Sequence, residues 1–236
     1  MTLAVFVLLG VTVFVAAFAQ GSAGMGFAMI AAPVVSLVDP ALIPVLLLVL
    51  MIPLNSYVGW RERADLDWRG ITWISVGRFA GTFLGLWILL VVSMQQLSLL
   101  IGISTIVAAV VALLAPAFDP NRTGLTVVGL ITGVTETSTG VGGPPLALAY
   151  QHKSGPMLRS TVAVCFLVGE VISLVVLGIS GQIQGATLLV SAALLPFVGL
   201  GSFVSRFTHH RLDGPLLRYL VLVFAIVSGI IVIAQA

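Results

Sequence analysis

The sequence predicts an all-α protein that crosses a membrane several times and consists of two inverted repeats. Three observations predict this class. Hydrophobic residues make up 59% of the 236 residues and charged residues only 8%, long apolar runs follow one another, and their order recurs in the second half. A soluble domain carries about 25% charged residues, and so few charges could not cover a water-facing surface of this size. We therefore expect a lipid bilayer around the chain.

The apolar runs predict the helices in order. A helix needs about 20 residues to cross roughly 30 Å of hydrocarbon. Six runs have about this length and are predicted to be transmembrane helices: 41–60, 70–92, 97–117, 158–179, 185–207 and 215–234. Two runs, 2–38 and 124–150, begin the two halves and carry glycine-rich centres. We predict that each of these is a re-entrant or broken-helix hairpin.

The basic residues lead to the hairpin prediction. Lysine and arginine are favoured in cytoplasmic loops. If the loop with Arg122 and the loop with Lys153 and Arg159 lie on one side, segment 124–150 must enter the membrane and return. The other basic residues of the connections are Arg61, Arg63, Arg69, Arg206 and Arg211, whereas 93–96 and 180–184 carry none. The alternative is eight simple spans, with some loops that violate the charge rule.

The two halves also resemble each other in sequence, which predicts repeat 1 at 1–117 and repeat 2 at 124–236. Ser22 to Gly26 and Ser138 to Gly142 both read S-x-G-x-G, and in this alignment Gln20 corresponds to Glu136. One hairpin and three crossings in each half give an odd number of crossings. The second half is then inverted relative to the first, as in many transporters.

The stretch 135–145 combines five consecutive polar residues with paired glycines and prolines. A charge at the bilayer centre costs roughly 2.5–3.5 kcal/mol, and irregular backbone at that depth is tolerated only inside protein or beside a wet cavity. A helix that restarts there offers N–H groups and a positive dipole end to an anion. The predicted anion ligands at the two breaks are Gly24, Gly26, Thr137, Ser138, Thr139, Gly140, Gly142 and Gly143. Alternatively, these glycines only let helices pack closely, as Gly77, Gly81 and Gly85 are expected to do.

Three ionisable residues and one amide lie within the apolar runs. Arg78 could bind the anion, neutralise Glu136 or Glu170, or extend to the membrane surface. Glu136 and Glu170 could carry a coupling proton, because desolvation disfavours a charged carboxylate, or could be structural partners of Arg78. Asn55 could bind substrate or a neighbouring helix.

Several of these residues together resemble one family. The glycine-rich first run that ends near Ala32-Pro33, Asn55, the Asp67-Trp68-Arg69 loop and the G-x-G-G-P element at 140–144 look like the TauE/SafE family. This resemblance spans nearly the whole chain. It implies a multi-pass anion transporter that exports sulfite or related sulfur compounds.

The predicted function is secondary transport of a small anion, most simply export of sulfite or a related sulfur-containing or organic anion by alternating access. The alternative is a passive anion channel. We expect no enzyme activity, because Ser138 and His152 lie at opposite ends of one segment and no nucleophile motif is present. We also expect no cofactor, no metal, no nucleic-acid partner and no removable signal, since no basic residue precedes the first apolar run. The expected partners are the small anion and the bilayer of the cell (inner or plasma) membrane, and the glycine stripes permit a homodimer without requiring one.

Overall fold

The computed structural model describes residues 2–23, 26–114, 119–212 and 215–236. In these residues the chain forms helices and no strand. The long and short α-helices are α1 (Leu3–Ala23), α2 (Phe27–Val38), α3 (Val45–Arg61), α4 (Trp68–Val91), α5 (Met94–Leu114), α6 (Arg122–Thr139), α7 (Gly143–Tyr150), α8 (Gly155–Ile179), α9 (Gly185–Leu212) and α10 (Pro215–Gln235). Within the described chain, five helices are long and apolar enough to cross a membrane by length and composition: α1, α4, α5, α8 and α9.

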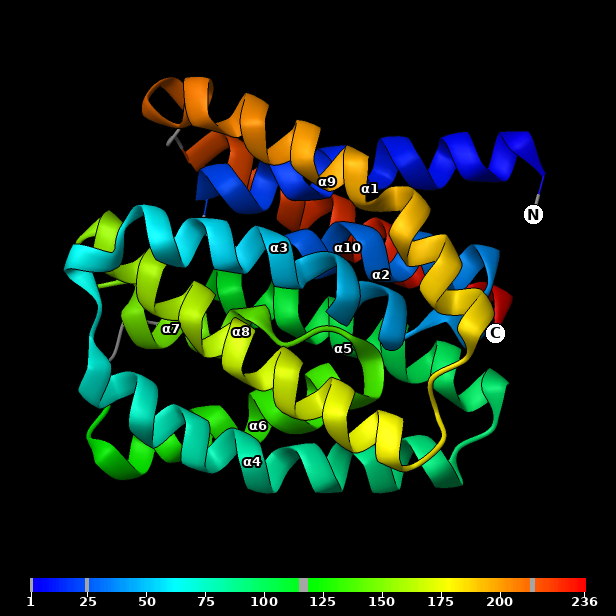
Figure 1. Cartoon of the computed structure of the whole chain (residues 1–236), viewed down its shortest axis with the longest axis horizontal. Coiled ribbons are helices and arrows are strands. Elements are labelled where there is room, and N and C mark those ends of the chain that lie inside the picture. The colour runs from blue at the N-terminus through cyan, green and yellow to red at the C-terminus, as the bar shows by residue number, and fades with distance from the viewer. Residues whose placement is uncertain (1, 24–25, 115–118, 213–214) are drawn as a thin grey trace.

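Each of the two predicted hairpin regions contains a pair of helices separated by a break. In the first, α1 and α2 pack on one another, and in the second α6 and α7 do so. The chain reverses direction at each break, and successive helices alternate in direction along the chain (Figure 1). The division into two repeats stays a prediction, but each half does supply one such pair followed by three further helices.

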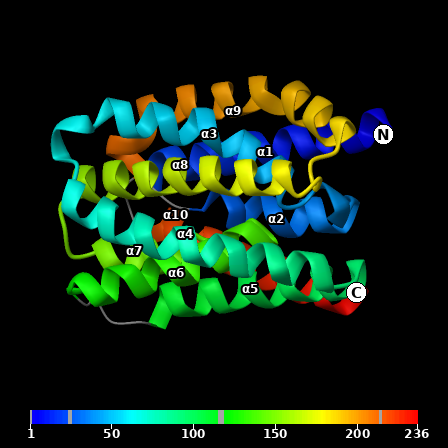
Figure 2. The same cartoon turned by 60° about the horizontal axis from the view of Figure 1, so that its bottom comes forward.

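The helices are arranged so that the two halves interlock. Helix α1 packs along α9 at one edge of the molecule, and α4 packs along α6 at the opposite edge (Figure 1). Between these edges, α3 packs on α8 and α5 on α10. The same layering is visible after rotation (Figure 2). Each of these contacts joins a helix of the first half to one of the second, so the interior between them belongs to both halves.

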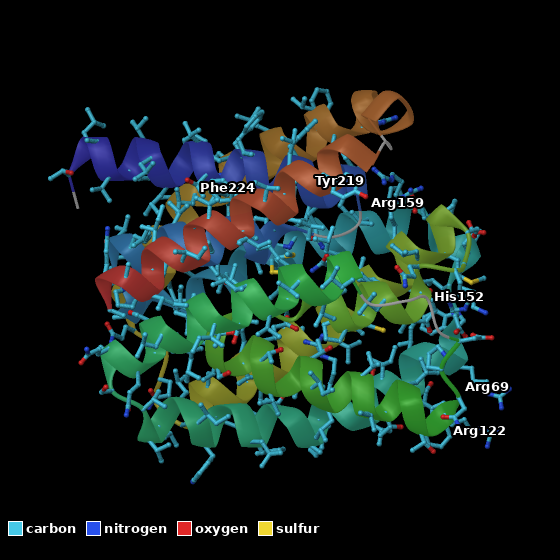
Figure 3. All side chains as sticks on the ribbon, turned by 180° about the vertical axis from the view of Figure 1, so that it is seen from behind. Arg69, Arg122, His152, Arg159, Tyr219 and Phe224 are labelled. Atoms are coloured by element: carbon cyan, nitrogen blue, oxygen red, sulfur yellow. The ribbon has the colours of Figure 1, made fainter. Side chains whose placement is uncertain are left out.

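The distribution of side chains is that of a membrane protein. Large apolar side chains cover the outside of α4 and α10, for example Trp87, which is 63% exposed, and Val223, which is 58% exposed. Tyr219 and Phe224 project outward from α10 (Figure 3). In contrast, Arg78, Glu136 and Glu170 are completely buried. A protein stable in water has the opposite arrangement, so the fold class predicted from composition is confirmed.

One end of the molecule gathers the basic loops. Arg69, Arg122, His152 and Arg159 all lie at this end (Figure 3). Arg159 Nε donates to both carboxylate oxygens of Glu62, each at 3.1 Å, which ties α8 to the loop before α4. The loops that the charge rule places on one side therefore do lie together. The side chains of His209, His210 and Arg211 lie outside the described residues.

At this end Asp119 joins the loop before α6 to the loop after α7. It accepts from His152 Nε2 at 2.9 Å and from Lys153 Nζ at 3.4 Å. The hydrogen bond from Lys153 is the main cause that lowers the pKa of Asp119 below its ordinary value. This contact keeps the outer ends of the second hairpin together.

Glycines allow α4 and α6 to approach closely enough to position the interior polar groups. A Cβ atom at Gly77 would overlap the carbonyl oxygen of Thr126, and one at Gly81 would overlap that of Leu130. A Cβ at Gly85 would lie 2.7 Å from the carbonyl oxygen of Val134. The predicted role of these three glycines in helix packing is confirmed. Arg78 follows Gly77 directly, so its side chain starts at this close contact.

Candidate functional site

The break between α6 and α7 is produced by its glycines and prolines. Gly140 ends α6 with a φ of 74°, a left-handed conformation that favours glycine. Pro144 and Pro145 follow at the start of α7, where their missing N–H groups remove no helical hydrogen bond. The same prolines leave α7 with fewer amide donors at its N-terminus than the sequence prediction assumed. Side chains must therefore contribute more of any anion site at this break.

The hydroxyl groups that precede this break are largely engaged. Ser138 Oγ donates to the carbonyl oxygen of Val134 at 2.8 Å, and Thr139 Oγ1 donates to that of Thr135 at 2.7 Å. Thr137 Oγ1 instead shares a hydrogen bond of 2.8 Å with Ser173 Oγ on α8. Of the three predicted hydroxyl ligands, only Thr137 is directed by this contact toward a neighbouring helix.

The break between α1 and α2 is organised by an amide side chain. Gly26 precedes α2 with a φ of 119°. The following N–H, that of Phe27, donates to Gln20 Oε1 at 3.1 Å. Gln20 Nε2 lies 3.5 Å from Asn55 Oδ1 on α3. These bonds tie the start of α2 to α1 and α3, while the Ser22 hydroxyl at the end of α1 is buried without a partner among the described residues. The predicted ligand Gly24 lies outside the described residues.

The centre of the molecule holds a buried ion pair. Arg78 Nη2 on α4 donates to Glu136 Oε2 on α6, and both side chains are completely buried. The guanidinium lies against Gly169 of α8, where a Cβ atom would overlap it. Its Cζ atom is 5.7 Å from the centroid of the Phe166 ring. Arg78 of the first half is therefore contacted by two helices of the second half, α6 and α8.

A second carboxylate lies beside this pair. Glu170 follows Gly169 on α8, and its Oε1 accepts a hydrogen bond of 2.6 Å from Asn55 Nδ2. Hydrogen bonds thus connect Phe27 at the first break, through Gln20 and Asn55, to Glu170 next to Arg78. The two breaks and the buried charges form one continuous polar interior.

Several buried polar atoms of this interior have no hydrogen-bond partner among the described residues. They are Nε and Nη1 of Arg78, Oε1 of Glu136, Oε2 of Glu170, and the hydroxyl groups of Thr82 and Thr132. Buried donors and acceptors are nearly always paired with protein, water or an ion. An unpaired donor buried in this way costs about 1–3 kcal/mol. The arrangement therefore has donors and acceptors available for a polar guest.

The structure brings some predicted residues together and separates others. Arg78, Glu136, Glu170 and Asn55 meet in the interior. The proposal that Arg78 extends to the membrane surface is wrong, because its side chain is completely buried and paired with Glu136. The predicted ligands at the second break lie next to this cluster, since a Cβ at Gly142 would lie 2.8 Å from Glu136 Oε2.

Sequence reasoning missed several residues of the site: Gln20 as a cap, Phe166, Gly169 and Ser173 as contacts, and the free hydroxyls of Thr82 and Thr132. For Gly169 the sequence did contain a signal, because this glycine directly precedes a glutamate, Glu170, within an apolar run. No group of three or more His, Cys, Asp or Glu side chains in the described part of the chain is placed to hold a metal ion.

An apolar exterior, two broken helix pairs and a buried ionic centre between the halves define a multi-pass membrane transporter. A family model, that of the sulfite exporter TauE/SafE, matches residues 9–232. The chain belongs to this family, as its resemblance in sequence indicated, and is a membrane transporter of the sulfite-exporter type. No curated protein and no solved structure matches the chain.

Proposed function

We propose that this protein exports sulfite or a closely related sulfur-containing anion by alternating access, with Arg78 as the central substrate ligand. The observation that carries this proposal is the state of the guanidinium, which is completely buried while two of its three nitrogens have no hydrogen-bond partner among the residues that the structure describes. An oxyanion presents several acceptor oxygens to such donors, and arginine matches this geometry better than lysine. The family to which the chain belongs supports the same substrate class.

The remaining predicted ligands are assigned to the walls of the same site. Asn55 and Thr137 approach it from α3 and α6, and Gly140, Gly142 and Gly143 form the second break beside Glu136. Ser138, Thr139 and Gly26 have roles in shaping the breaks, because the two hydroxyls bond within α6 and Gly26 precedes the capped Phe27 amide. The guanidinium occupies the space left by Gly169, and its Cζ lies 5.7 Å from the centroid of the Phe166 ring, so these two residues position the donor groups of Arg78.

The contact between Arg78 and Glu136 suggests how a proton is coupled to the anion. A substrate anion and the Glu136 carboxylate are both attracted to one guanidinium. Protonation of Glu136 weakens its hold on Arg78, which favours binding of the anion. Glu170, with one free oxygen close by, is the second candidate for proton transfer. The cycle then moves an anion together with a proton.

Alternating access requires two parts that move against each other. The interlocking of α1 with α9 and of α4 with α6, and the alternating helix directions, support inverted repeats at 1–117 and 124–236 (Figure 1). The full burial of Arg78 and Glu136 supports a gated transporter rather than an open channel. We assign the protein to the cell membrane with its basic end inside, and a homodimer is compatible with this arrangement.

The test is transport of radiolabelled sulfite into proteoliposomes with and without a pH gradient. We expect the wild type to accumulate sulfite above equilibrium. Arg78→Lys keeps the positive charge but loses the planar guanidinium with its several N–H donors. We expect the initial rate of sulfite transport to fall about tenfold, as the loss of one charged hydrogen bond predicts. Arg63→Gln is the matched control, because Arg63 is exposed at the basic end, where its side chain bonds to the Trp60 carbonyl oxygen and lies over the Trp60 ring. An absence of sulfite transport by the wild type would overturn the proposal. Movement of sulfite only down its own gradient, without accumulation inside the proteoliposomes, would indicate a channel.

A further inference from the structure

Two hollows meet at the N-terminus of α6. The first is an apolar groove of about 730 Å³ between α5, α6 and α7, lined among others by Val107, Val127, Ile131, Pro144 and Leu148. The second is a polar hollow of about 550 Å³ between the start of α4 and the start of α6, which contains Arg69 and Arg122. Asn121 and Thr123 line both. The two hollows therefore adjoin at these shared residues, and the lining changes from charged in the second hollow to apolar in the first.

The apolar groove has the length of one half of a bilayer. Its lining on α6 runs from Thr123 to Thr135, which at 1.5 Å per residue is roughly 18 Å. Half of the hydrocarbon core is about 15 Å. Val107 and Ile131 are 54% and 46% exposed, so the groove opens outward to the surrounding lipid. An extended acyl chain fits this length better than a docked transmembrane helix, which would need the full thickness.

The polar hollow carries the charge that complements an anionic headgroup. Arg69 and Arg122 are exposed and have no ion-pair partner among the described residues. Arg122 lies with its Cζ 5.7 Å from the ring centroid of Trp73, which is the arrangement expected at a membrane interface. Among the described residues that line this hollow, the acidic one is Asp67, which already accepts from Tyr150 Oη at 2.9 Å and from the Gly70 N–H at 3.0 Å. Both arginines point to the same end of the molecule (Figure 3).

We propose that this surface binds one anionic phospholipid, with its phosphate between Arg69 and Arg122 and one acyl chain in the groove of α5, α6 and α7. Basic pockets between membrane helices at a positively charged end are suited to such headgroups. The site is separate from the transported anion, because Arg69 and Arg122 lie at the membrane surface and Arg78 is buried. The inner end of the groove reaches Thr135, Val141 and Pro144 at the second break, so a bound lipid contacts the segment that carries Glu136.

The experiment is native mass spectrometry of the full chain in detergent, with phosphatidylglycerol or phosphatidylcholine of the same acyl chains added. We expect the wild type to retain phosphatidylglycerol in preference to phosphatidylcholine. The double variant Arg69→Gln with Arg122→Gln should lose this preference. Each arginine is expected to contribute a factor of about five to the retention of phosphatidylglycerol relative to phosphatidylcholine. Arg63→Gln, an exposed arginine at the same end but outside both hollows, should leave it unchanged.

A second variant tests the groove separately from the charges. Ala108 lines the groove on α5, and Ala108→Phe should lower retention of both lipids while leaving sulfite transport measurable. Equal retention of the two lipids by the wild type, or an equal loss in Arg63→Gln, would overturn the proposal. It would also be overturned if the spectra showed a dimer that Ala108→Phe separates, because a second copy would then be the occupant. The lipid-retention results do not depend on whether the protein transports sulfite.

Discussion

The two halves of the molecule place different chemistry at corresponding positions. Gln20 at the first break aligns with Glu136 at the second, and one is a neutral amide while the other is a carboxylate. Asn55 on α3 and Glu170 on α8 are 115 positions apart, within one position of the same alignment, and they bond to each other. The first half therefore contributes amides where the second contributes acids.

This difference is visible in the hydrogen bonds at the two breaks. In the first half, Gln20 accepts a hydrogen bond from the Phe27 amide, and the Ser22 hydroxyl is buried without a partner among the described residues. In the second half, Glu136 and Glu170 each keep one oxygen without a partner among the described residues. The charge that both acids surround, Arg78, comes from α4 in the first half. The unpaired carboxylate oxygens beside Arg78 therefore belong to the second half, and the amides that bond around the first break belong to the first half.

The largest effect is expected when the guanidinium is removed. Arg78→Ala leaves Glu136 as a buried unpaired charge, which should cost about 3–5 kcal/mol of stability. The double variant Arg78→Met with Glu136→Gln should recover most of this loss, because it removes both charges and keeps similar volumes. The measurement is thermal unfolding in detergent at neutral pH. If Arg78→Ala melted like the wild type, or the double variant recovered nothing, the ion pair would not be the organising contact of the interior.

A smaller effect is expected when the guanidinium is displaced rather than removed. Gly169→Ala puts a methyl group where the guanidinium lies, whereas Gly199→Ala on α9 meets no atom within 4 Å. We expect Gly169→Ala to lose about 1–3 kcal/mol through overpacking and to slow sulfite transport, and Gly199→Ala to do neither. Unfolding and proteoliposome flux are measured side by side. Equal behaviour of the two variants would mean that Arg78 has room to move.

Much of the fold was readable from the sequence because lipid imposes simple rules. A charge in an apolar run is costly, so Arg78, Glu136 and Glu170 stood out without any structure. Likewise, the proline pair at 144–145 and Gly140 marked the second break through backbone geometry alone. These signals depend on local composition, which a sequence contains directly.

The partners of these residues were not readable, since they depend on which helices pack. Arg78 could have paired with Glu136 or with Glu170, and only the close contact of α4 with α6 decides for Glu136. Ser138 and Thr139 looked like free ligands, yet their hydroxyls bond to carbonyl groups within their own helix. A short polar side chain in a helix can bond either to a carbonyl group of its own helix or to a group outside it, and the sequence does not distinguish these two arrangements.

The smallest effect on transport, and the sharpest test of the difference between the halves, is expected at Gln20. Gln20→Leu removes the acceptor of the Phe27 amide and the partner of Asn55 Oδ1, which should cost about 1–3 kcal/mol of stability, but it touches no charged group of the site. We therefore expect sulfite transport to persist in this variant, whereas Glu136→Gln at the aligned position should abolish accumulation driven by a pH gradient. Both variants are compared at equal amounts of folded protein. If Gln20→Leu abolished accumulation as completely as Glu136→Gln, the first break would take part in the transport cycle as directly as the second.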